Sequence, residues 1–206
     1  YMFKNRIING AMVIDQRNAG ASLTNGAGLT TYCVDRWNFY GTSGSKFTAQ
    51  QNAGSVTPPA GFKTYLGFTS LAATTPASSD FYYFVQTIEG FNFYDFNFGT
   101  ANAVSVSISF WVRSSLTGTF SGCLQNGTRS YPFNFTISSS NTWEQKTITI
   151  AGDTTGTWTG ATNGAGVSLF FNLGSGSSNV GTAGAWASAN YVGASSSVNV
   201  IGTNGA

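Results

Sequence analysis

The chain contains 206 residues, of which 41% are hydrophobic, 15% are aromatic and only 8% are charged. This length and apolar content suffice for one domain with a sizeable core, and they exclude an intrinsically disordered chain. Nine Lys and Arg residues against seven Asp and Glu residues give a net charge of +2, far below the basic excess that nucleic-acid binding requires. Nucleic acid is therefore not an expected partner.

Apolar and polar residues alternate with period two along much of the chain, between clusters of Gly, Asn and Ser that favour turns. In chain order, this pattern predicts β-strands at residues 5–14, 31–40, 46–51, 62–68, 81–88, 104–113, 119–125, 131–137, 143–150, 167–173 and 197–201. Helical periodicity is nearly absent. These strands and their spacing favour an all-β fold, an antiparallel two-sheet jelly-roll β-sandwich.

Two predicted strands stand out. In residues 104–113, one side is apolar and the other carries small polar residues together with Trp111 and Arg113; the apolar side consists of Val104, Val106, Ile108, Phe110 and Val112. This side is expected to face the core. Residues 81–88 are apolar on both sides, which is typical of a central strand that is covered on both faces.

Several kinds of site are excluded by residue type. The chain has no histidine, so Ser-His-Asp and Cys-His catalytic arrangements cannot form. Cys33 and Cys123 have no CxxC spacing and lie in apolar segments, where we expect either buried free thiols or one disulfide. Asn9, Asp15 and Asp153 lack the spacing of a calcium loop. We therefore expect no metal and no cofactor.

No apolar run approaches the roughly 18 residues that span a bilayer, and Tyr1, Met2 and Phe3 are followed directly by Lys4. This start does not have the pattern of a signal peptide. The sequence predicts a soluble protein without membrane insertion, and a chain that begins with Tyr reads as a piece of a longer polypeptide.

Six stretches of the sequence are long and unusual enough to compare with known families. They read NRIINGAMVIDQRNAGAS (5–22), CVDRW (33–37), QTIEGFN (86–92), GTANAVSVSISFWVRSSLTGTFS (99–121), NTWEQKTITIAGDTTGTW (141–158) and VNVIGTNGA (198–206). Together they resemble a recurrent module of bacteriophage tail-fibre and related virion proteins, over almost the whole chain. The order of the tryptophan-bearing strands is also similar to that of jelly-roll carbohydrate-binding modules.

The resemblance implies a virion location, at the tail fibre or another surface projection, and host adhesion through surface glycan or polysaccharide. It also implies contacts with other virion proteins and assembly as a homotrimer. Members of that family usually continue past a TNGA-like segment into one further strand. Residues 1–206 are accordingly expected to form a single β-sandwich module from which the final strand is absent, with residues 5–14 as the exposed edge that recruits another chain.

A glycan site needs flat apolar rings and planar hydrogen-bonding groups. Trp111 and Arg113 face away from the apolar side of their strand, and Tyr82 and Gln86 alternate along residues 81–88. If the two strands are neighbours, these four side chains converge on one concave face and form the glycan site. The opposing interpretation is that the aromatic segment 90–99 covers Trp111, which then serves as packing.

Two alternatives to glycan binding follow from other residues. A purely structural virion module, a spike, collar or capsid decoration, would use the same fold for subunit packing without binding sugar. A glycosidase would need two carboxylates, such as Glu89 with Asp95 or Glu144, but most acidic residues have turn roles, and no enzyme activity is expected.

Trp37 and Trp143 are predicted to pack at sandwich corners, whereas Trp158 and Trp186 either anchor loops or meet a ligand. Asp15, Arg17, Asp35 and Arg36 are expected to form ion pairs among the first strands.

Overall fold

The computed structural model describes residues 4–206 and is all-β; Tyr1, Met2 and Phe3 lie outside the described residues. Its strands are β1 (Leu23–Thr24), β2 (Thr31–Tyr32), β3 (Asn38–Gly41), β4 (Phe47–Gln51), β5 (Leu66–Ser70), β6 (Phe81–Glu89), β7 (Val106–Val112), β8 (Gly118–Gln125), β9 (Ser130–Ile137), β10 (Glu144–Ile150), β11 (Ala165–Ser175), β12 (Val180–Gly181) and β13 (Gly193–Ala194). Five single-turn 3₁₀ helices connect them: η1 (Ala53–Ser55), η2 (Gly90–Asn92), η3 (Tyr94–Phe96), η4 (Ser177–Asn179) and η5 (Val200–Gly202).

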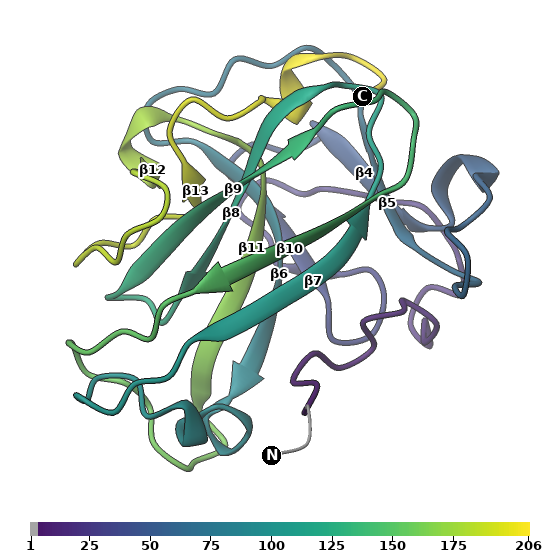
Figure 1. Ribbon diagram of the computed structural model, residues 1–206. Coiled ribbons are helices and arrows are strands. Elements are labelled where there is room, and N and C mark those ends of the chain that lie inside the picture. The colour runs from purple at the N-terminus through teal and green to yellow at the C-terminus, as the bar shows by residue number, and fades with distance from the viewer. Residues whose placement is uncertain (1–3) are drawn as a thin grey trace.

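The strands form two layers, as expected for a β-sandwich. The main layer is an antiparallel sheet of six strands in the order β2-β3-β6-β11-β8-β9. The second layer consists of two separate pieces, the antiparallel sheets β1-β4-β5 and β7-β10. Figure 1 shows β7 and β10 lying across β6 and β11. The short strands β12 and β13 pair in parallel beside β8 and β9.

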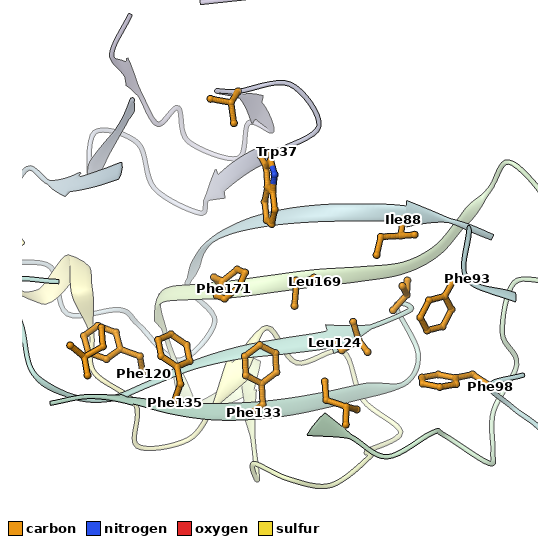
Figure 2. Packing of buried hydrophobic residues seen from close by; sticks show 14 residues of the cluster. Trp37, Ile88, Phe93, Phe98, Phe120, Leu124, Phe133, Phe135, Leu169 and Phe171 are labelled. Atoms are coloured by element: carbon orange, nitrogen blue, oxygen red, sulfur yellow. The ribbon is translucent and has the colours of Figure 1, made fainter. Parts of the chain in front are cut away.

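The core between the layers contains two groups of buried side chains. The larger lies under β7 and β10 and consists of 14 residues, among them Trp37, Leu169 and Phe171 (Figure 2). The smaller lies under β4 and β5 and includes Phe39, Phe47 and Tyr82. Both depend on the period-two alternation: Phe133, Phe135 and Ile137 of β9 point into the larger group, and Phe47 and Ala49 of β4 point into the smaller one.

Most predicted strands are confirmed, and 81–88 is indeed central, since β6 lies between β3 and β11. Residues 5–14 are not a strand: Asn9 and Met12 have φ values of 53° and 55°, and a turn replaces the extended backbone. Residues 31–40 are divided into β2 and β3 by a turn in which Arg36 has a φ of 75°. Residues 197–201 end in η5 rather than in a strand.

The side of residues 104–113 predicted to be apolar does face the core, but it is not fully buried. Val106, Ile108, Phe110 and Val112 are half-buried, and Val104, which precedes β7, is 47% exposed. Ile108, Phe110 and Val112 line the cavity beside β7, where the second layer is interrupted, and this leaves them partly accessible. Within residues 4–206, no helix is long and apolar enough to cross a membrane.

Candidate glycan site

The four predicted site residues do not converge. β6 pairs with β3 and β11, whereas β7 pairs with β10 in the other layer, so the two strands are not neighbours. Tyr82 and Gln86 point into the protein from β6 and are both 0% exposed. The prediction of a shared concave face is therefore wrong, and only Trp111 and Arg113 remain available to a ligand.

Gln86 has a structural role that sequence reasoning missed. Its Oε1 accepts a hydrogen bond from Ile8 N–H and its Nε2 donates to Ile8 C=O, both at 2.8 Å. A primary amide can pair with a backbone residue in the way that a neighbouring strand would. Gln86 thereby holds residues 5–14 against the sheet without a strand ladder.

Trp111 lies on the outer face of β7, and its side chain is accessible. The residue is 38% exposed. The aromatic segment 90–99 does not cover it: Phe93 and Phe98 of that segment pack on Trp158 at ring-centroid distances of 5.9 and 4.9 Å. The indole of Trp111 is thus free to stack on a ligand, and the packing interpretation does not apply to this residue.

Gln145 completes the surface around Trp111. It is the direct cross-strand partner of Trp111 in the antiparallel register of β10 with β7. Side chains at such paired positions lie about 5 Å apart at Cβ on one face of the sheet. The Gln145 Nε2 donates to Ser109 Oγ at 3.3 Å, which orients the amide beside the indole. Sequence reasoning missed Gln145, because the alternation within one strand does not show which residue of another strand lies opposite.

Arg113 follows Trp111 on the same face. Its Nε donates to the carbonyl oxygen of Asn141 at 2.9 Å, which fixes the guanidinium. This is the one hydrogen bond of its side chain within the described residues, and no carboxylate there lies within ion-pair distance. The two terminal nitrogens are therefore available to donate to ligand oxygens.

A cavity of about 770 Å³ adjoins this surface. It lies between β5 and β7, and its wall and rim include Trp111, Arg113, Gln145, Tyr65 and Trp143. Trp143 packs on Tyr65 at 5.5 Å and donates its Nε1 to Thr57 C=O at 2.9 Å. Its predicted packing role is confirmed, and it ties the loop before β5 to the start of β10.

All seven carboxylates of the chain are engaged in internal contacts. Four form ion pairs: Asp95 with Arg6, Glu89 with Arg36, Asp153 with Arg129, and Glu144 with Lys146. The other three accept hydrogen bonds from the chain, namely Asp15 from Asn18 and Gly20, Asp35 from Gln16, and Asp80 from Ala77 and Thr42. The expected ion pairing among Asp15, Arg17, Asp35 and Arg36 is therefore wrong.

The pKa directions agree with structural roles for the acids considered as a glycosidase pair. A hydrogen bond from Arg36 lowers the pKa of Glu89, and a hydrogen bond from Lys146 lowers that of Glu144. A general acid in a glycosidase needs a raised pKa instead. This geometry does not favour catalysis by these carboxylates.

The remaining candidates have structural surroundings. Cys33 and Cys123 are buried free thiols; burial, with a smaller contribution from Asp15, raises the pKa of Cys33 to about 11, and burial also raises that of Cys123. Trp37 is buried as predicted. Trp158 and Trp186 anchor loops, since their indole nitrogens donate to Thr155 C=O and Ala151 C=O. No group of three metal-ligating side chains occurs in residues 4–206.

Comparison of the chain with protein families, with curated proteins and with solved structures finds no match.

Proposed function

We propose that this protein is a jelly-roll module of a phage fibre that binds glycan on the host surface through the outer face of β7 and β10. The observation that carries the proposal is the exposed indole of Trp111 with Gln145 directly opposite and Arg113 two residues further on. An aromatic ring packs on the C–H face of a sugar, while amide and guanidinium groups bind its hydroxyls. The resemblance to tail-fibre modules supports the virion location.

The site is built on a rigid element. β7 and β10 are paired without interruption over seven residues, from Glu144 opposite Val112 to Ile150 opposite Val106. Trp111 and Gln145 are therefore fixed relative to each other before any ligand arrives. A site with side chains fixed in this way loses less conformational entropy on binding.

A second candidate function is purely structural, as a spike, collar or decoration module that packs against other virion subunits. The outer face of the main sheet favours it, because Tyr40 stacks on Phe81 and Tyr83 at 5.3 and 5.7 Å. These rings are half-buried. Burial, with a smaller contribution from Tyr40, raises the pKa of Tyr83 to about 12, which agrees with a ring that is largely removed from water. Such a face suits close subunit contact, including contact within the proposed homotrimer.

The two functions are separated by a glycan array of bacterial surface polysaccharides, probed with the protein and with Trp111→Ala. Glycan binding predicts that at least one polysaccharide is retained by the protein and lost or weakened about fivefold or more by the variant, since stacking contributes about 1 kcal/mol or more. Tyr94→Ala is the matched control, because Tyr94 is another exposed aromatic residue but lies on η3.

The control variant should bind like the unmodified protein, and circular dichroism should show that both variants are folded. A folded protein that retains no polysaccharide, or equal loss in both variants, would contradict the proposed site and favour the structural function.

A further inference from the structure

The outer face of β7 and β10 carries a single charge. Every second side chain of these paired strands points outward with Trp111, and exposure alternates along both strands accordingly. The outward residues are Ser107, Ser109 and Trp111 of β7, Gln145, Thr147 and Thr149 of β10, and Arg113 directly after β7. All of them except Arg113 are uncharged, so any selection for charge on this face depends on Arg113.

The one acidic residue of β7 and β10, Glu144, points to the inner side. It lies opposite Val112, whose side chain belongs to the inner, apolar row. Its carboxylate pairs with Lys146 at 2.6 Å and accepts hydrogen bonds from the N–H groups of Ser138 and Ser139 at 2.8 Å. Because Glu144 is engaged in this way, Arg113 has no acid to pair with among the residues that the structure describes.

The guanidinium of Arg113 is oriented before any ligand binds. Its Nε donates to Asn141 C=O at 2.9 Å, which leaves the two terminal nitrogens for a ligand. A guanidinium presents parallel N–H groups that match the two oxygens of a carboxylate, and such charge-assisted pairs are stronger than hydrogen bonds between neutral groups. A sugar hydroxyl would leave the positive charge unbalanced. The free edge of Arg113 therefore fits a carboxylate better than a hydroxyl.

The spacing of the face relates this carboxylate to the stacked sugar. Side chains two residues apart on one strand are about 7 Å apart. A sugar that stacks on Trp111 thus brings an acid group of its own, or one of the next sugar in the chain, to Arg113. Gln145 lies opposite Trp111 and binds hydroxyl groups. Together the three side chains suit a glycan chain that contains uronic acid, a sugar that carries a carboxylate.

We propose that the glycan bound on Trp111 is acidic and that Arg113 binds the carboxylate of a uronic acid in it. This inference rests on the proposed glycan function and names Arg113 as the residue that selects acidic over neutral polysaccharide. The charges of the whole chain are compatible with a polyanion. The net charge is +2, and all seven carboxylates have partners within the chain, so none is left free to repel the ligand at this face.

The experiment prints each bacterial surface polysaccharide on the array twice, as isolated and after carboxyl reduction. Reduction converts the carboxylate to a primary alcohol and keeps the sugar ring and its other hydroxyls. The polysaccharides retained by the unmodified protein should contain uronic acid, and their reduced forms should bind about tenfold more weakly or worse, since a hydrogen-bonded charge pair is lost. Binding to the isolated forms should also weaken as NaCl rises from about 0.05 M to about 0.5 M, because salt screens the pair.

Three variants assign the effect to Arg113. Arg113→Gln should bind the isolated forms about tenfold more weakly or worse but the reduced forms like the unmodified protein. Arg113→Lys keeps the charge without the planar fork, so its affinity should lie between the two. Arg17→Gln is the matched control, because it removes the same charge from an exposed arginine that lies over Tyr32 of β2, and it should bind like the unmodified protein.

The failure of this inference differs from the failure of the glycan function. Polysaccharides that are lost in Trp111→Ala, but bind equally after carboxyl reduction and in Arg113→Gln, would overturn the acidic ligand and leave the glycan site in place. Equal loss in Arg113→Gln and Arg17→Gln would show an effect of net charge alone and would also overturn it. An array that retains nothing would overturn both proposals. If circular dichroism shows that Arg113→Gln is unfolded, Arg113→Lys and the reduced polysaccharides decide the question.

Discussion

The charge on Asp153 is buried and paired. The residue is 2% exposed, and its carboxylate accepts from Arg129 at 2.7 and 2.8 Å through its two oxygens. Burial alone would raise the pKa of Asp153, but hydrogen bonds from Arg129 and Thr155 outweigh it and hold the pKa below its usual value. This ion pair joins the start of β9 to the loop after β10, beside Trp158.

Replacing the acid with its amide, Asp153→Asn, should lower the free energy of unfolding by about 3 kcal/mol at pH 7, because Arg129 then keeps a largely buried charge without a partner. A depressed folded-state pKa stabilises the protein above the unfolded value of about 3.9, and this stabilisation is lost as pH falls through the folded value. Urea unfolding should therefore show that the difference in free energy of unfolding between the unmodified protein and Asp153→Asn becomes smaller below about pH 4. Glu89→Gln, in a pair whose Arg36 and Glu89 side chains are 36% and 30% exposed, is the control and should cost under about 1 kcal/mol. If Asp153→Asn and the unmodified protein had equal free energies of unfolding at pH 7, the stabilising role of the Asp153–Arg129 ion pair would be contradicted.

Two isoleucines in paired strands test how open the second layer is. Ile150 of β10 is 0% exposed, whereas Ile108 of β7 lines the cavity and is half-buried. Ile150→Ala should lower the free energy of unfolding by about 3 kcal/mol, and Ile108→Ala by about 1 kcal/mol, because less apolar surface is removed from water at Ile108. Denaturant titration of both variants measures the difference. Equal losses in the two variants would mean that the apolar side chains of β7, Ile108 among them, are as buried as Ile150.

At the scale of elements, residues 5–14 are attached to β6 by one side chain. The two hydrogen bonds of Gln86 to Ile8 take the place of strand pairing. Thr64 and Gln51 add contacts to the carbonyl groups of Ala11 and Met12. Asp35 N–H also donates to Ile14 C=O at 2.9 Å, so the end of the segment has one backbone hydrogen bond, whereas the part around Ile8 is held by the side chain of Gln86.

The variant Gln86→Leu should release this segment while leaving the sheets folded. Leu fills the apolar volume but cannot bond to Ile8, so hydrogen exchange of the Ile8 amide should become about tenfold faster or more. Amides in the middle of β6 and β11 serve as the internal reference and should not change. Unaltered exchange at Ile8 would mean that other contacts hold the segment.

The alternation of apolar and polar residues predicted most of the strands that have one side chain row in the core. It could not predict which strands lie next to each other in a sheet. Residues 106–112 form a strand as expected, but that Gln145 lies opposite Trp111 depends on a register set by two separate segments. The prediction of a strand at 5–14 is wrong because the apolar residues there have the alternation of a strand, whereas the backbone turns at Asn9. Trp111 and Arg113 were identifiable from the outward face of one strand. Tyr82 and Gln86 were not distinguishable from them until β6 was seen to be central.

At the scale of the whole molecule, the homotrimer stays a prediction that the resemblance to phage fibres supports. The low charge and the stacked rings on the outer face of β6 suit subunit contact. Sedimentation equilibrium should find a species of three 21.6-kDa chains at micromolar concentration. A monomer under those conditions would contradict the trimer without affecting the proposed glycan site, because all residues of that site belong to one chain.

The central claim is that glycan binds on Trp111, and NMR of the tryptophan indole N–H groups tests it most directly. The chain has five tryptophans, so it gives five indole signals, and the Trp111→Ala spectrum identifies the one from Trp111. Titration with a polysaccharide retained on the array should shift the Trp111 signal progressively and leave that of buried Trp37 in place. A saturating titration that leaves the Trp111 signal unmoved would contradict the account.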